Sequence, residues 1–86
     1  MYQILYSKQA VKDIEKLKHS KLNEKARQLI EIIKHDPFQT PPPFEKLLGD
    51  LDGYISRRIN IKHRIVYKVY EADQTVKIYR MWTHYE

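Results

Sequence analysis

Residues 54–70 read YISRRINIKHRIVYKVY, and this stretch decides the fold. Apolar and polar side chains alternate in two runs, at 54–61 and 64–70, which predicts two β-strands. The short Lys62-His63 connection between the runs favours a hairpin. A third alternating run, at 75–83, follows a turn at 71–74. Three sequential strands with short turns predict an antiparallel meander.

The residues upstream of the meander predict a strand and two amphipathic helices. Residues 2–6 alternate bulky side chains and indicate a short first strand. Ser7 can cap a helix over about 8–18, whose apolar face comprises Ala10, Val11, Ile14 and Leu17. A second apolar stripe runs from Leu22 to about His35 and ends at Asp36-Pro37, because a residue before proline disfavours helical geometry. The fold class is therefore α+β: a short N-terminal strand, a two-helix hairpin that needs a sheet to cover it, and the antiparallel meander.

A proline-rich loop at 36–44 joins the helices to the meander. Its four prolines restrict the backbone and are expected to deliver Glu45 to a fixed place at low entropic cost. A short strand is expected at 46–48. The turn at 50–53 contains Gly53, which can take a positive φ.

Composition limits the classes of function. Eighty-six residues predict one domain, 1–86, with a shallow site that suits a polymer better than a small metabolite. A net charge of +5 favours an anionic partner such as nucleic acid. The absence of cysteine excludes disulfides and thiolate chemistry, and the spacing of the four histidines matches no metal motif, so neither metal nor cofactor is expected. With no export signal and no apolar run of about 20 residues, we expect a cytoplasmic protein that does not enter membranes.

The pleat of the 54–61 strand sorts its side chains into two faces. The face expected to be open to solvent or ligand carries Tyr54, Ser56, Arg58 and Asn60, whereas the face expected in the core carries Ile55, Arg57, Ile59 and Ile61. Arg58 is then a displayed charge beside an aromatic ring, a combination that suits phosphate and base together. Arg57 is expected to reach out at an edge or to pair with a carboxylate.

Arg58 and Arg64 are close enough in sequence to meet across the hairpin. Two neighbouring guanidiniums repel each other unless an anion lies between them. Either they form a phosphate clamp, or each is a surface arginine paired with Glu71 or Asp73, and the spacing alone does not decide between these.

The second half of the chain carries enough chemistry to cut RNA. Glu45 can take a proton, the arginines can hold phosphate, and the imidazole of His84 can return a proton to the leaving oxygen. His63 is expected to be structural or to contact phosphate. His84-Tyr85 could instead be a frayed tail, although packing of Trp82 would anchor the strand that precedes it.

The segments that carry this chemistry also resemble a known family. FEKL at 44–47, LDGYISRRIN at 51–60, HRIVY at 63–67 and the final His84-Tyr85 resemble the YoeB/Txe toxins of the RelE superfamily, the toxin half of bacterial type II toxin–antitoxin pairs. The resemblance implies a RelE-like microbial ribonuclease-type fold. It also implies a ribosome-dependent mRNA endoribonuclease that cleaves at the decoding (A) site without a metal.

The resemblance further implies roles and partners. By position, Glu45 matches the general base, His84 the general acid and Arg64 the arginine that stabilises the transition state. Arg58 and Tyr85 match residues that hold the substrate, and Arg57 and His63 are further substrate-binding candidates. The implied partners are a cognate YefM/Axe-like antitoxin whose C-terminal segment wraps the toxin, and the ribosome with its mRNA. A second copy of the chain, in a homodimer, is a further candidate partner. Operator DNA would be reached only through the antitoxin complex.

Two other functions are compatible with the same architecture. One is a ParE-like inhibitor of DNA gyrase, which does not need the set Glu45, Arg64 and His84. The other is a basic RNA-binding module that cuts nothing. The chain also departs from the family pattern, because Phe44 and Lys46 flank Glu45 where the family often has prolines, and its prolines stand at 41–43 instead.

Overall fold

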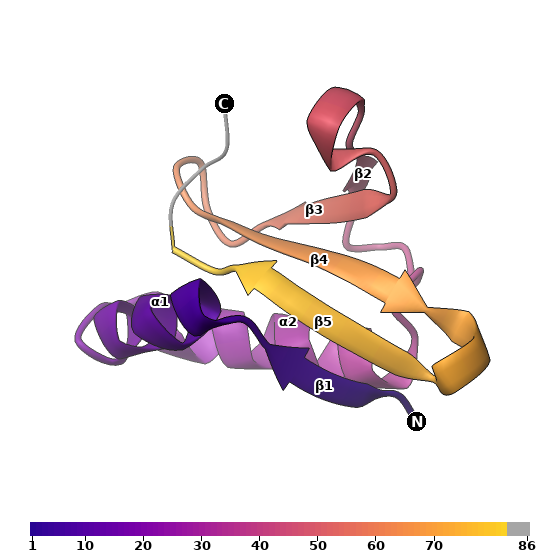
Figure 1. Cartoon of the computed structure of the whole chain (residues 1–86). Coiled ribbons are helices and arrows are strands. Elements are labelled where there is room, and N and C mark those ends of the chain that lie inside the picture. Colours follow the sequence, from indigo (N-terminus) through magenta and orange to yellow (C-terminus); the bar gives the residue numbers. More distant parts are fainter. Residues whose placement is uncertain (83–86) are drawn as a thin grey trace.

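A five-stranded sheet with strand order β1-β5-β4-β3-β2 organises the molecule (Figure 1). The computed structural model describes residues 1–82. In chain order the elements are β1 (Gln3–Tyr6), α1 (Lys8–Lys18), α2 (Asn23–His35), β2 (Glu45–Lys46), β3 (Tyr54–Arg58), β4 (Arg64–Tyr70) and β5 (Thr75–Arg80), with short 3-10 turns at Gly49–Leu51 and Glu71–Asp73. The predicted α+β class, with its strand, helix pair and meander, is confirmed.

Neighbouring strands from β2 to β5 pair antiparallel, as the meander prediction requires. The first strand differs, because β1 pairs parallel to β5, so the sheet is mixed. Backbone bonds hold both ends of β1: the Gln3 amide donates to the Gln74 carbonyl and the Ser7 amide to the Ile78 carbonyl, each at 2.9 Å. Alternation of side chains predicts a strand but not its partner, so the parallel pairing could not be read from the sequence.

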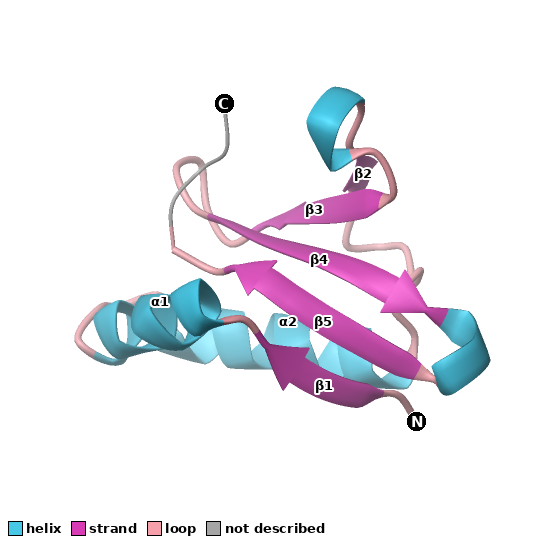
Figure 2. Ribbon diagram, in the orientation of Figure 1, coloured by secondary structure: helices cyan, strands magenta, loops and turns pink. Residues whose placement is uncertain are grey.

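Both helices lie on the same side of the sheet (Figure 2). The predicted cap of α1 is confirmed, since the Ser7 hydroxyl accepts a hydrogen bond of 3.0 Å from the Ala10 amide. Val11, expected on the apolar face, is instead half exposed. The core between helices and sheet is formed by Ala10, Leu17, Ala26, Leu29 and Ile33 from the helices and by Ile55, Ile65, Tyr67, Val76 and Ile78 from the strands.

The opposite face of the sheet has no helix over it. We call it the open face. It carries Glu45, Tyr54 and Arg58 from β2 and β3, Arg64 and Lys68 from β4, and Lys77 and Tyr79 from β5.

The first and last meander strands are shorter than predicted, whereas β4 has the predicted bounds. The strand predicted at 54–61 ends at Arg58, and Ile61, expected in the core, is 88% exposed. The Asn60 side-chain oxygen accepts hydrogen bonds of 2.8 and 2.7 Å from the Lys62 and His63 amides, which turns the chain before Ile61 can join the sheet. The last strand ends at Arg80 rather than at 83, and β2 begins at Glu45 itself rather than at Lys46.

Candidate active site

A carboxylate–arginine ion pair lies where β2, β3 and β4 meet on the open face. Glu45 is directly opposite Ser56, and Ser56 is directly opposite Val66, two residues beyond Arg64. This register brings the Glu45 Oε1 atom within 3.5 Å of Arg64 Nη1. Arg64 therefore pairs with Glu45, and the alternative in which it pairs with Glu71 or Asp73 is wrong. The Glu45 side chain remains 62% exposed, whereas that of Arg64 is only 19% exposed.

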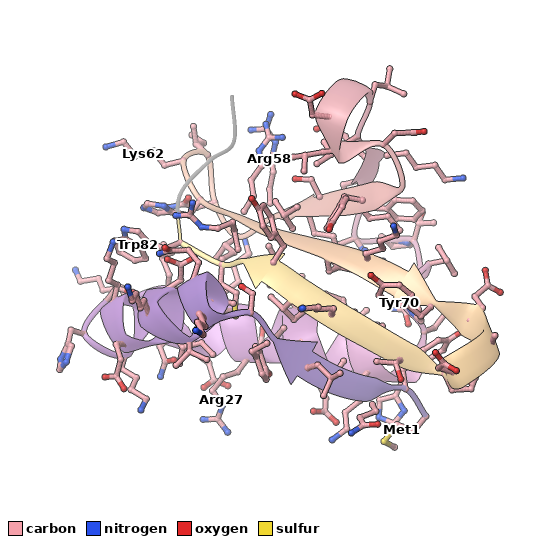
Figure 3. The ribbon with its side chains drawn as sticks, in the orientation of Figure 1. Met1, Arg27, Arg58, Lys62, Tyr70 and Trp82 are labelled. Carbon is pink, nitrogen blue, oxygen red and sulfur yellow. The ribbon has the colours of Figure 1, made fainter. Side chains whose placement is uncertain are left out.

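Arg58 completes a cluster of charges beside this pair. It is directly opposite Arg64 in the β3–β4 register and is exposed, at the end of β3 that leads into the loop of Lys62 (Figure 3). Two guanidiniums on directly opposite positions repel each other, which favours an anion between them. Arg58 also lines a hollow of about 280 Å³, shared with Lys25, Leu29, Pro42, Pro43, Phe44, Glu45 and Ser56.

Ser56 does not match its prediction. It was expected to be open to solvent beside Tyr54 and Arg58, but it is buried, and its hydroxyl has no hydrogen-bond partner among the described residues. It lies between Glu45 on β2 and Val66 on β4 in the sheet register.

Arg57 was expected at an edge or against a carboxylate, and this prediction is wrong. The residue is only 1% exposed. Its Nε donates to the Tyr67 hydroxyl at 2.9 Å, and its two Nη atoms donate to three backbone carbonyls of the proline loop, those of Pro37, Gln39 and Pro42, at 3.1, 2.8 and 2.6 Å. A side chain enclosed in this way does not reach a substrate on the open face, so the burial opposes its assignment to substrate binding.

The buried Arg57 instead fixes the loop that precedes Glu45. Tyr67 contributes a second tie, because its hydroxyl donates to the Pro37 carbonyl at 2.7 Å. Burial raises the pKa of Tyr67, so this hydroxyl keeps its proton at neutral pH. The guanidinium of Arg57 also lies 5.0 Å from the centroid of the Phe44 ring, next to Glu45. Proline stiffness was predicted from the sequence, but the side chain that holds the loop was not.

His63 lies against Trp82. The two rings stack with centroids 4.2 Å apart and planes inclined by 22°, and Trp82 packs against the core. The expected anchoring by Trp82 is therefore confirmed, and His63 has the structural contact that was one of its two expected roles. His84 and Tyr85, predicted to act as general acid and as substrate-holding residue, lie outside the described residues.

A buried carboxylate that sequence reasoning missed supports the same end of β5. Asp13 of α1 is fully buried and accepts hydrogen bonds from the Met81 amide at 2.9 Å, Arg80 Nε at 3.0 Å and the Gln9 side chain at 3.2 Å. Burial alone would raise the pKa of Asp13, but the bonds from Met81, Arg80 and Gln9 outweigh it and hold the pKa below its usual range. The available signal was a charged residue in register with the buried positions Ala10 and Leu17 of the helix.

Two further findings concern the described part of the chain. Within residues 1–82, no group of three or more potential metal ligands comes together. No helix in that range has the length and apolar character needed to cross a bilayer.

The fold and the site together define a class: a small basic α+β protein whose uncovered sheet face holds a carboxylate–arginine pair. The chain belongs to the YoeB-like toxins of bacterial type II toxin–antitoxin systems, because the model of that family matches residues 6–85. Among curated relatives, the toxin YoeB of Streptomyces coelicolor is 42% identical over 65 residues, which cover 76% of this chain and 75% of the relative. The toxin YoeB of Synechocystis is 41% identical over 66 residues, covering 77% and 74%. The resemblance read from the sequence is confirmed.

Solved structures give the same family. A YoeB/ParE toxin from Agrobacterium tumefaciens superposes with a TM-score of 0.88 at 32% identity, covering 96% of this chain and 99% of that one. The toxin in a YoeB–YefM complex from Staphylococcus aureus gives 0.82 at 33% identity, covering 99% of both chains. A dimer of the Staphylococcus aureus YoeB is also among the similar structures, at 0.82 and 33%, with 98% of both chains covered.

Proposed function

We propose that this toxin is a ribosome-dependent endoribonuclease that cleaves mRNA at the decoding (A) site and so inhibits translation. The observation that carries the proposal is the Glu45–Arg64 pair on the open face, with Arg58 directly opposite Arg64. A carboxylate beside two guanidiniums supports a site in which a proton acceptor lies next to a bound phosphate. Membership of the YoeB-like toxins supports the same reading.

The proposed reaction is attack of a ribose 2′-oxygen on the adjacent phosphorus. Glu45 removes the proton of the 2′-hydroxyl, and the new O–P bond forms as the bond to the 5′-oxygen breaks. Arg64 and Arg58 stabilise the charge of the five-coordinate phosphorus. His84 donates a proton to the departing 5′-oxygen, and Tyr85 holds the substrate. The products are a 2′,3′-cyclic phosphate and a 5′-hydroxyl, the residues need no metal for this chemistry, and DNA lacks the nucleophile.

Substrate binding would activate Glu45. In the free protein its carboxylate is exposed and is paired with Arg64. A phosphate bound by Arg64 would compete for that arginine and leave the carboxylate free to accept a proton. Exclusion of water by the ribosome and bound mRNA would strengthen the effect. This requirement explains why we expect cleavage on the ribosome and slow cleavage of free RNA.

The proposed partner is an acidic YefM-like antitoxin that neutralises the toxin in the cytoplasm, where its ribosomal target lies. The Staphylococcus aureus relative occurs in a YoeB–YefM complex and as a dimer. A net charge of +5 suits an acidic antitoxin segment. Operator DNA would be bound through the complex, and a homodimer is the proposed form of the free toxin.

The test is primer extension on a defined mRNA incubated with the protein and programmed ribosomes. We expect the wild-type protein to cleave at the A-site codon. Cleavage should be lost in Glu45→Gln, Arg64→Ala and His84→Ala. It should be kept in the control Glu71→Gln, which removes an exposed carboxylate from the turn after β4. A parallel arm with free RNA and EDTA tests whether residual cutting needs a metal. Intact mRNA from folded protein would refute the proposal, and accumulation of cleaved DNA–gyrase complexes would establish a ParE-like inhibitor instead.

A further inference from the structure

A second pair of opposed cations lies on the open face, away from Arg58 and Arg64. Lys68 of β4 and Lys77 of β5 are directly opposite each other in the antiparallel register. Within residues 1–82, neither lysine forms an ion pair with a carboxylate. Like charges at directly opposed positions destabilise a sheet. The arrangement therefore favours an anion over these two strands as well.

A β-bulge places a tyrosine beside this lysine pair. Val66 is opposite Arg80 and Tyr67 is opposite Ile78, so Tyr79 is an extra residue in β5. A bulge changes the direction of the side chains around it. Here Arg80 turns to Asp13 on the helix side, while Tyr79 stays 37% exposed and contacts Tyr54 of β3, with ring centroids 5.6 Å apart and planes inclined by 56°. Since β3 and β5 flank β4, the two rings meet above β4 on the open face.

Lys68 contacts two aromatic rings, those of Tyr54 and Tyr70. Its Nζ lies 5.5 Å from the centroid of the Tyr54 ring and 5.6 Å from that of Tyr70. These contacts place the ammonium group beside both rings. Tyr70 is itself exposed and lines a shallow hollow of about 450 Å³ with Leu5, Asp73 and Lys77.

The second cation pair continues the candidate active site along the sheet. Lys68 follows Arg64 by four residues of β4, a separation of about 13 Å along an extended strand. Figure 3 shows Arg58 and Tyr70 toward the two ends of this run. An extended polymer that places one phosphate between Arg58 and Arg64 can therefore place another between Lys68 and Lys77.

We propose that Tyr54, Lys68, Tyr70, Lys77 and Tyr79, which we call the tyrosine–lysine patch, bind the single-stranded RNA that flanks the cleaved bond. Lys68 and Lys77 hold a backbone phosphate, and an unstacked base packs on Tyr79. Exposed rings beside ordered cations match single-stranded nucleic acid, because every base offers a stacking surface and every linkage a charge. An acidic peptide would use the lysines but not the rings. The inference rests on the proposed function and adds a binding subsite to it.

The test measures binding separately from cleavage. The probe is a fluorescein-labelled single-stranded 2′-O-methyl RNA of twelve nucleotides, which lacks the nucleophile and cannot be cut. Affinity is followed by fluorescence anisotropy from low to moderate salt. We expect Lys68→Ala/Lys77→Ala to weaken binding and to reduce the slope of log K against log salt by the amount expected for about one phosphate contact. Lys12→Ala/Lys16→Ala is the matched control, because it removes the same charge from exposed positions on α1, and it should leave the slope near that of the wild type.

The contribution of a ring is tested at Tyr79 by one substitution that removes the ring and one that keeps it. Tyr79→Ser should weaken binding about fivefold or more, the effect of removing one stacking surface, and Tyr79→Phe should restore it. No measurable binding by the wild-type protein at low salt overturns the proposal, and so does an equal loss in the α1 control or in Tyr79→Phe. A labelled oligoglutamate peptide is measured alongside. Loss of peptide binding with unchanged RNA binding in the lysine variant would assign the patch to an acidic protein instead.

The outcomes separate this inference from the proposed function. If A-site cleavage fails but RNA binding depends on the patch, the patch is an RNA-binding site on a protein with another activity. If cleavage occurs and substitutions in the patch leave RNA binding unchanged, only the present inference fails.

Discussion

Two consecutive arginines of β3 show how differently the two faces of this sheet are built. Arg57 points to the helix side, is almost completely buried, and donates to three loop carbonyls and a tyrosine hydroxyl. Arg58 points to the open face, is exposed, and lies opposite another arginine. One pleat of the backbone therefore separates a side chain that holds the fold from one that is available to bind a ligand.

The two faces of the sheet differ in how their polar and charged groups are paired. On the helix side, polar groups are satisfied within the protein: Arg57 by carbonyls and Asp13 by Arg80 and Met81. On the open face, two pairs of like charges oppose each other across neighbouring strands. Such an arrangement costs stability in the free protein and is relieved when an anion binds.

The largest expected effect is that of removing the buried arginine. Arg57→Ala removes the donor to the Tyr67 hydroxyl and to the Gln39 and Pro42 carbonyls and leaves a cavity in the core, so the free energy of unfolding should fall by about 3–5 kcal/mol. Urea denaturation measures it, and Arg58→Ala is the matched control, expected to change stability by less than about 1 kcal/mol. Equal losses in the two variants would break the contrast between the faces.

Substitutions in the Glu45–Arg64 pair of the open face should have the opposite effect: a large loss of cleavage and almost no loss of stability. Arg64→Ala and Glu45→Gln are expected to slow single-turnover cleavage on programmed ribosomes by about 100-fold or more. Their unfolding free energy should stay within about 1 kcal/mol of the wild-type value, because the pair is partly exposed. Thermal unfolding of the same samples provides the control. A large loss of stability would mean that the pair is structural.

Asp13, on the helix side, should make the free energy of unfolding depend on pH. Asp13→Asn should lower the free energy of unfolding at neutral pH by about 2–3 kcal/mol, since hydrogen bonds to a buried charge are strong. The folded-state pKa of Asp13 is lowered, so its contribution is complete above about pH 4 and is lost as the pH falls through the lowered value. The difference between wild type and variant should therefore shrink in acid. A difference that stays constant from neutral pH into strong acid would contradict the ionised state of Asp13.

The smallest expected effect is the loss of stability when a tyrosine hydroxyl is removed, compared between the two faces. Tyr67→Phe removes a buried group that accepts from Arg57 and donates to Pro37, and should cost about 1–2 kcal/mol of stability. Tyr79→Phe removes a hydroxyl on the open face and should stay within about 0.5 kcal/mol. Chemical denaturation of both variants under one set of conditions makes the comparison. Similar costs for both would show that the open face also depends on its polar contacts.

The sequence predicted those features that depend on local pattern. The helical stripe over Ala10 and Leu17, the Ser7 cap, the positive φ of Gly53 and the order of the meander strands were all readable and are confirmed. The closeness of Arg58 and Arg64 followed from their spacing. The roles given to Glu45, Arg64, His84 and Tyr85 remain predictions that the cleavage assay will test.

Other features could not be predicted because they depend on segments far apart in the chain. Ile61 looked like a core residue by alternation, but the Asn60 turn ended the strand first. Arg57 shared a face with isoleucines, and nothing local indicated that a loop 15 to 20 residues earlier would present its carbonyls there. The bulge at Tyr79 arises from the pairing of β4 with β5 and has no signature in either strand alone.

The sequence by itself determined the class of fold and the family, and it supplied the candidate residues for acid–base chemistry on RNA, because periodicity and motif are properties of neighbouring residues. Only the tertiary structure decided which arginine is buried, which carboxylate pairs with Arg64, and that a second pair of cations lies along the same face. The physical reason is that burial and charge pairing depend on which strands and loops come together, and that choice is made by packing of the whole chain.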